Sequence, residues 1–157
     1  MWRISWVLCG ELAVGPAPRH ASHGARLLEE GITGVLSLCS EAEAPPPALP
    51  LRLQQRRLVL PDHRAGRPPR LQELERALVL LAELRQQGPV YVHCKAGVER
   101  SPLVCLAWLM QRRSLRQLEA LDYLMQVHPP TGVLPQQLEV LTQLSLVPPQ
   151  SKHANVA

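Results

Sequence analysis

The residues with the clearest capacity for chemistry lie in the stretch HCKAGVERS, positions 93–101. Cys94 and Arg100 stand at the two ends of a loop with five residues between them. An apolar run precedes this loop and another follows it, so we expect the loop to connect a strand to a helix. In such a turn the backbone N–H groups point into one concavity at the positive end of the helix, an arrangement that binds a phosphate group.

The side chains of this loop suit attack on phosphorus. Gly97 permits a backbone conformation that bulkier residues resist. Arg100 can bind two phosphate oxygens with its planar guanidinium. Cationic surroundings and a helix terminus lower the pKa of a cysteine from about 8.5 into the range of about 3.5 to 7.5, which would make Cys94 a thiolate nucleophile at neutral pH. Ser101 can donate a hydrogen bond to the sulfur as it departs from phosphorus.

A second motif, LPDHR at positions 60–64, supplies a carboxyl group. Asp62 directly follows a predicted strand and stands 32 residues before Cys94, a separation that leaves room for one helix and one strand. Both loops would then meet at the carboxyl edge of one sheet. A single carboxyl group can protonate the leaving oxygen and afterwards activate water. We therefore expect in-line attack by Cys94 and a phosphocysteine intermediate.

Strand and helix patterns alternate around these two loops. Together they indicate one α/β domain over residues 1–157, with a central, mainly parallel sheet flanked by helices and a loose tail from about 148. Residues 10–18 read as a turn-rich connection, and Ser114 with Gln117 has the spacing of a helix capping box. Strands are predicted at 2–8, 32–38, 56–60 and 90–92, and helices at 20–30, 70–87, 101–110, 114–127 and 135–146.

Composition narrows the possible partners and location. The net charge is +4, and the chain has three Trp, two Tyr and no Phe, so the core must be built mainly from Leu, Val and Ala. With so few aromatic side chains we expect no nucleic-acid binding. No apolar run is long enough to span a membrane and no signal peptide is recognised, so we expect no membrane insertion and a cytoplasmic location. The four cysteines form no C-x-x-C pair, so we expect no metal or other cofactor, and Cys9 and Cys105 read as core residues.

The pattern H-C-x-x-G-x-x-R-S resembles the cysteine-dependent protein tyrosine phosphatases, and the short chain is similar to their dual-specificity branch over roughly residues 1–146. The resemblance implies that Cys94 is the nucleophile, Arg100 the phosphate binder and Asp62 the general acid. It also implies that Ser101 assists the second step and that His93 orients the loop. Candidate substrate-binding residues are Lys95, Ala96, Gly97, Val98 and Glu99, with His63 open to either substrate contact or plain solvent exposure.

Three details are similar to the phosphatase-and-tensin lipid phosphatases: HCKAG, the pair Asp62-His63, and Cys39, which falls where those enzymes carry a cysteine able to form a disulfide with the nucleophile. A half-buried thiol without a redox role is the alternative for Cys39. Val98 stands where those enzymes have a second lysine, and Glu99 adds negative charge, so a highly charged inositol lipid headgroup is disfavoured.

The leading prediction is a phosphatase for phosphotyrosine and, if its pocket is shallow, for phosphoserine and phosphothreonine in proteins. The alternatives are a phosphatase of a small or lipid phosphomonoester and a pseudophosphatase that only binds. A sulfur transferase of rhodanese type is a further alternative, against which Asp62 and the spacing from Cys94 to Arg100 count. Gln136 and Gln137 receive no firm role and are interpreted as exposed residues of a first helical turn.

Overall fold

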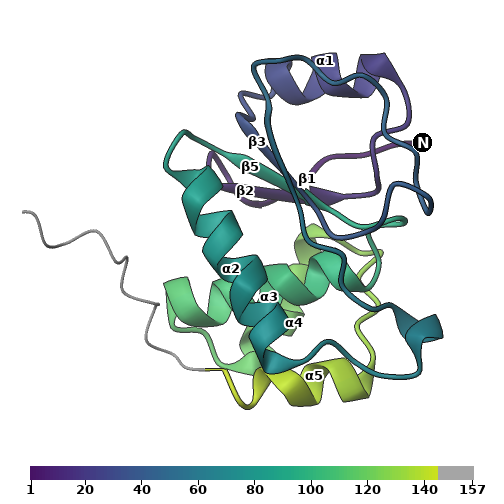
Figure 1. Ribbon diagram of the computed structural model, residues 1–157. Coiled ribbons are helices and arrows are strands. Elements are labelled where there is room, and N and C mark those ends of the chain that lie inside the picture. The colour runs from purple at the N-terminus through teal and green to yellow at the C-terminus, as the bar shows by residue number, and fades with distance from the viewer. Residues whose placement is uncertain (145–157) are drawn as a thin grey trace, which may run out of the picture.

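The structure, a computed structural model of the chain, describes residues 1–144. Its centre is a five-stranded sheet with the order β1-β2-β5-β3-β4, in which β1 is antiparallel to β2 and all other neighbours are parallel. Helix α1 covers one face and α2, α3, α4 and α5 lie on the other (Figure 1). The α/β fold with a mainly parallel central sheet is thus confirmed. The elements are β1 (Ser5–Leu8), β2 (Leu12–Gly15), α1 (Ala21–Glu29), β3 (Gly34–Ser37), β4 (Gln54–Arg57), the 3-10 helix η1 (His63–Ala65), α2 (Leu71–Arg85), β5 (Val90–His93), α3 (Arg100–Arg113), α4 (Gln117–Val127) and α5 (Pro135–Leu141).

Buried side chains alternate between the two faces of the sheet along its central strands, so a hydrophobic core lies on each face. Because successive strand residues point to opposite faces, Val35 and Tyr91 pack with Leu27 of α1. Their neighbours Leu36 and Val92 belong to the larger cluster formed with α2, α3, α4 and α5. Every residue of α3 from 100 to 111 is buried, so this helix forms the centre of that layer. The loop that precedes α3 is therefore fixed to the most buried helix of the domain.

The interpretation of residues 10–18 as a connection is wrong, because this segment contains β2. Gly10 adopts a positive φ of 70° between the two strands of a hairpin. Leu12–Gly15 then runs parallel to β5, pairing Leu12 with Val90 and Gly15 with His93. Flanking glycines and prolines mask this short strand in the sequence, and its pairing partner decides its conformation. The first strand also begins at position 5 rather than position 2.

Three further boundaries differ from prediction. The fourth strand occupies Gln54–Arg57 rather than 56–60, because the parallel register with β3 places Gln54 opposite Gly34. Ser114 ends α3 with a positive φ, and the backbone N–H of Arg116 donates to Glu119, so α4 begins later than the proposed capping box. Helix α5 ends at Leu141 rather than near 146. The predicted loose tail lies outside the described residues.

Candidate active site

The loop between β5 and α3, here called the phosphate loop (residues 94–100), lies at the carboxyl end of the sheet. The segment that follows β4, here called the acid loop (residues 61–69), faces it. The two loops line one cavity of about 390 Å³. The structure thus brings most of the predicted site residues together around a single opening. The lining residues are Arg19, Asp62, His63, Arg64, Cys94, Lys95, Ala96, Val98, Glu99 and Arg100.

The carbonyl groups of the phosphate loop are held from outside the loop. Because carbonyls and N–H groups point in opposite directions along a peptide, this leaves the amides of the loop to face the cavity, where they can bind an anion. The outer contacts are His93 Nδ1 to the carbonyl of Cys94 (2.9 Å), Ala17 N–H to Lys95 (3.1 Å), His128 Nε2 to Gly97 (2.6 Å) and Gly132 N–H to Val98 (2.7 Å).

Gly97 is required by both backbone conformation and space. Its φ is 71°, in the left-handed region that favours glycine. A Cβ atom at this position would lie 2.5 Å from the carbonyl carbon of Gly15, the last residue of β2. The strand that sequence analysis missed therefore presses directly against the phosphate loop.

Cys94 is 3% exposed, and its Sγ lies 3.3 Å from Ser101 Oγ. Burial raises the pKa of the thiol. This effect of burial is outweighed, and the pKa of Cys94 lies below its ordinary value. The causes that lower it are hydrogen bonds from the Ser101 hydroxyl and from the backbone N–H groups of Ser101 and Gly97, together with the charge of Arg100. These donors favour the thiolate, which is the form that attacks an electrophile.

Two buried histidines stabilise the loop as neutral side chains. His93 Nδ1 donates to the carbonyl of Cys94, so Nε2 accepts the hydroxyl of Ser37 at 2.7 Å. Burial is the main cause that lowers the pKa of His93 to about 4. His128 likewise donates from Nε2 to Gly97, while Nδ1 accepts from Ser5 at 2.8 Å, and burial lowers its pKa. His93 was predicted as a support. His128 begins the stretch HPPTGVLPQQL, which is similar to a segment near the site in the resembled family, but it was assigned no role.

Arg100 is 4% exposed, and its guanidinium is paired with Glu43, a residue that sequence analysis did not select. Nη2 donates to Glu43 Oε1 at 2.7 Å, and Nη1 donates to Oε2 at 3.2 Å. Nη1 also lies within hydrogen-bond distance of the carbonyls of Leu38 and Leu60. The hydrogen bond from Arg100 is the main cause that lowers the pKa of Glu43 to about 2. Within the described residues Nε has no protein partner, so this donor remains for an oxyanion.

The acid loop is anchored at both ends. Near its start, the N–H of Leu60 donates to the carbonyl of Leu38 at 3.0 Å. Near its end, Arg67 binds both carboxylate oxygens of Glu73 in the first turn of α2, each at 2.8 Å. Between these anchors, Asp62 Oδ1 accepts the N–H of Arg64 at 2.9 Å, and Asp62 lines the same cavity as Cys94.

Glu99 is held between the acid loop and α5. Its Oε2 accepts from His63 Nδ1 at 2.9 Å, and its Oε1 accepts from Gln137 Nε2. Gln136 is exposed as expected, but the interpretation of Gln137 as exposed is wrong, because its side chain is 1% exposed. Gln137 Oε1 also accepts the N–H of Leu134 at 2.9 Å at the start of α5.

The other cysteines differ in their surroundings. Cys39 is fully buried just beyond the end of β3, and burial is the main cause that raises its pKa. Its carbonyl accepts a hydrogen bond from Arg57. Cys105 is buried in α3, as predicted, whereas the assignment of Cys9 to the core is wrong, because Cys9 is exposed at the β1–β2 turn.

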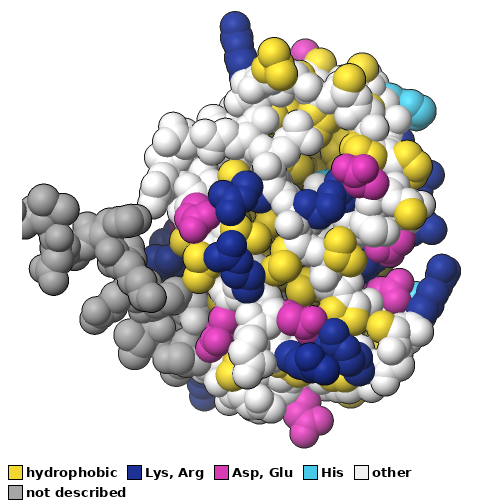
Figure 2. All heavy atoms as spheres, in the orientation of Figure 1, with side chains coloured by type: hydrophobic (Ala, Val, Ile, Leu, Met, Phe, Trp, Pro, Cys, Tyr) yellow, Lys and Arg dark blue, Asp and Glu magenta, His cyan; other side chains and the backbone are white. Residues whose placement is uncertain are grey.

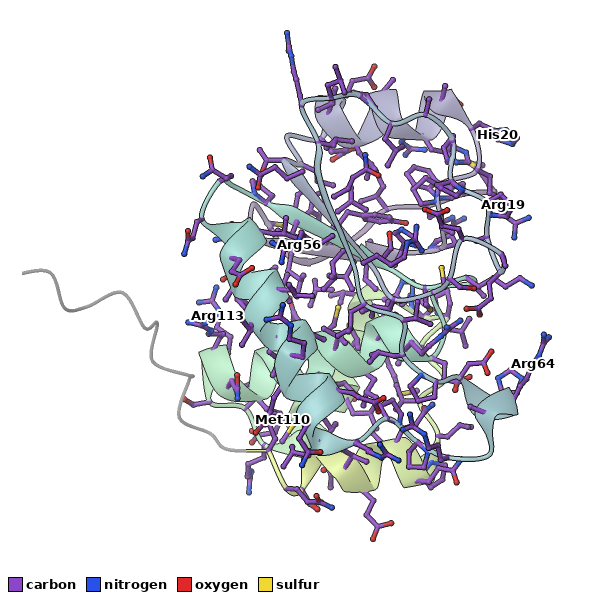
Figure 3. The ribbon with its side chains drawn as sticks, in the orientation of Figure 1. Arg19, His20, Arg56, Arg64, Met110 and Arg113 are labelled. Carbon is purple, nitrogen blue, oxygen red and sulfur yellow. The ribbon has the colours of Figure 1, made fainter. Side chains whose placement is uncertain are left out.

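Exposed cations surround the cavity mouth. Arg19, which precedes α1, and Arg64 of η1 lie at the same edge of the molecule (Figure 3), and Lys95 lines the same cavity. On the face shown in Figure 2, by contrast, acidic and basic side chains are interspersed. Within residues 1–144, no group of three His, Cys, Asp or Glu side chains is arranged to hold a metal ion, and no helix is both long and apolar enough to cross a membrane.

Residues 19–145 match the family model of the dual specificity phosphatase catalytic domain. The chain therefore belongs to this family of cysteine-dependent phosphatases, and the resemblance of the HCKAGVERS motif is confirmed. Dual specificity protein phosphatase 12 of Mus musculus is 36% identical over 123 residues, which cover 78% of this chain and 35% of the relative. Dual specificity protein phosphatase 5 of Homo sapiens is 41% identical over 61 residues, which cover 36% of this chain and 16% of the relative.

A solved structure agrees with this assignment. The crystal structure of PTPMT1 in complex with PI(5)P superimposes with a TM-score of 0.77 at 26% identity, covering 90% of this chain and 93% of that one.

The curated relatives named above are much longer than this chain, which spans about a third of one and about a sixth of the other. The fold and the family are thus shared by proteins of different overall length.

Proposed function

We propose that this chain hydrolyses phosphotyrosine, and phosphoserine or phosphothreonine, in proteins through a phosphocysteine intermediate. The observation that carries the proposal is the thiol of Cys94, which accepts hydrogen bonds from the backbone N–H groups of Gly97 and Ser101 and lines one cavity with Asp62 and Arg100. No metal or other cofactor takes part in the proposed reaction. The cytoplasm is the proposed location, because its reducing conditions keep the thiol free.

In the first step, the thiolate of Cys94 attacks phosphorus in line with the leaving oxygen. The sulfur–phosphorus bond forms and the phosphorus–oxygen bond breaks, while the carboxyl group of Asp62 gives its proton to the leaving alkoxide or phenoxide. The loop amides and Nε of Arg100 stabilise charge on the remaining oxygens. Lys95, Ala96, Gly97 and Val98 contribute through their position in this loop.

In the second step, the carboxylate of Asp62 takes a proton from water, and the resulting hydroxide attacks the phosphocysteine. The sulfur–phosphorus bond breaks, inorganic phosphate forms, and the sulfur leaves as a thiolate. The hydroxyl of Ser101, 3.3 Å from the sulfur, donates a hydrogen bond to this developing charge. His93 keeps the loop in place for both steps through its bond to the carbonyl of Cys94.

The test is hydrolysis of an aryl phosphate by the purified chain without added metal, compared with three variants. Cys94→Ser and Arg100→Lys should abolish measurable turnover, and vanadate should inhibit the wild type. Asp62→Asn should reduce turnover by about 100-fold for a substrate with a poor leaving group. Turnover by the Cys94→Ser variant at the wild-type rate would refute the assigned nucleophile.

A phosphatase of a lipid phosphomonoester is the second candidate, supported by the likeness to PTPMT1, which was crystallised in complex with PI(5)P. The cations Arg19, Arg64 and Lys95 at the cavity mouth suit an anionic headgroup. Glu99 in the same cavity opposes a headgroup of high charge. Parallel assays with phosphotyrosine peptides, phosphoserine peptides and PI(5)P distinguish the candidates, and a kcat/KM for PI(5)P above that of every peptide would overturn the protein-substrate proposal.

A further inference from the structure

A carboxylate in an anion-binding loop is electrostatically unfavourable unless it is bound elsewhere. Glu99 lies at the start of α3, inside the loop that would hold the phosphate dianion. Its side chain is 15% exposed and makes two hydrogen bonds. One comes from Gln137 of α5 and the other from His63 of the acid loop. Glu99 is therefore a bridge between two segments rather than a free charge.

The orientation of this bridge is fixed on the α5 side. Gln137 Oε1 accepts the N–H of Leu134, so its amide cannot turn without losing that bond, and Nε2 must face Glu99. Gln137 is also almost completely buried. One oxygen of Glu99 is thus bound to a buried side chain of α5. This bond restrains Glu99, and through its other oxygen Glu99 can restrain His63.

That residue is the immediate neighbour of the proposed general acid. His63 follows Asp62, and its side chain is 57% exposed, so packing alone does not hold it. Its Nδ1 lies 2.9 Å from Glu99 Oε2, so the hydrogen bond to Glu99 is the contact that holds this side chain. The anchors near the two ends of the acid loop, at Leu60 and Arg67, are hydrogen bonds to other segments and lie on either side of the pair Asp62-His63.

We propose that Glu99 and His63 form a latch that positions the carboxyl group of Asp62 over the phosphate loop. Glu99 and His63 act through Asp62 and are positioning residues. The latch rests on the proposed function, since it presupposes that Asp62 protonates the leaving group. A loop without the latch would sample orientations in which Asp62 is too far from the leaving oxygen to protonate it.

The test compares kcat/KM for two substrates that differ in their need for an acid: p-nitrophenyl phosphate, with a good leaving group, and phenyl phosphate, with a poor one. Glu99→Ala and His63→Ala should each lower kcat/KM for phenyl phosphate about 10-fold more than for p-nitrophenyl phosphate. The double variant should lose no more than either single variant, because both remove the same contact. Glu29→Ala, which removes an exposed carboxylate from α1, controls for net charge.

Asp62→Asn separates the failure of the latch from the failure of the proposed function. If Asp62→Asn affects the two substrates differently but Glu99→Ala and His63→Ala affect them equally, the latch is wrong and the acid assignment stands. Additive losses in the double variant would also overturn the latch. If Asp62→Asn affects both substrates equally, the acid assignment fails and the latch fails with it. His63→Ala keeps the test decisive if Glu99→Ala does not fold, because His63 is largely exposed.

Discussion

Replacing Glu43 by glutamine removes the charge that pairs with the buried guanidinium of Arg100. The hydrogen bond from Arg100, opposed by burial, lowers the pKa of Glu43 from 4.5 to about 2. A difference of this size corresponds to about 3 kcal/mol in favour of the ionised carboxylate in the folded chain. A glutamine side chain can accept one of the two hydrogen bonds, so we expect Glu43→Gln to lower the free energy of unfolding by about 2 kcal/mol at pH 7.

The pH dependence of this loss has a definite sign. Because the pKa of Glu43 is lower in the folded chain than in the unfolded chain, its contribution to stability is complete above about pH 4.5 and disappears as the pH falls through about 2. Urea unfolding at pH 7 and at pH 3.5 measures the effect. The difference in unfolding free energy between the wild type and Glu43→Gln should shrink by about 1 kcal/mol at the lower pH.

Glu41→Gln is the matched control, because Glu41 is an exposed residue of the same loop. This variant should unfold at the same urea concentration as the wild type. The reasoning is refuted if Glu43→Gln is as stable as Glu41→Gln at pH 7. It is equally refuted if the stability difference between Glu43→Gln and the wild type is the same at both pH values.

Three further outcomes are expected. Ser101→Ala removes the hydroxyl 3.3 Å from Cys94 Sγ, so the pKa of Cys94 should rise. The pH profile of alkylation by iodoacetamide measures this pKa, and an unchanged profile would contradict the stabilising contact. Gly97→Ala should lower kcat/KM by about 100-fold, because its Cβ would lie 2.5 Å from the end of β2. Gly66→Ala, with the same φ but open space, should remain active. If Cys39 has the redox role that the family resemblance implies, peroxide should link it to Cys94 in a disulfide found by non-reducing peptide mapping, and absence of that peptide would leave Cys39 as a thiol without a redox role.

Local patterns were sufficient for the parts of the fold with strong periodicity. The helical spacing of leucines predicted α2, and the apolar β-branched run predicted β3, because both patterns report burial within a few residues. The motif from His93 to Ser101 carried the family resemblance without any knowledge of tertiary structure. Strand β2 was missed because LAVG has too few residues to show a period, and its conformation depends on pairing with β5, far along the chain.

Among the residues around the cavity, those next to a recognisable strand were predictable, whereas those placed by contacts between distant segments were not. Asp62 was found because it directly follows a predicted strand, and the structure places it in one cavity with Cys94. Glu43 lies beyond the neighbouring strand β3, so the rule that ligands bind at carboxyl ends of strands was a usable signal for it. Gln137 lies in a stretch that is similar to a family segment near the site, but it was interpreted as exposed, because its burial and its bond to Glu99 depend on tertiary packing of α5 that local sequence does not report.

Attack of the Cys94 sulfur on phosphorus can be observed by rapid acid quench of the wild type and of Asp62→Asn during turnover of p-nitrophenyl phosphate, followed by peptide mass spectrometry. We expect a peptide containing Cys94 that carries one additional phosphoryl group, with more of it in Asp62→Asn, because the missing general base slows hydrolysis of the intermediate. A phosphoryl group on another residue, or turnover with no covalent intermediate at any quench time, would contradict the claim that this sulfur attacks phosphorus.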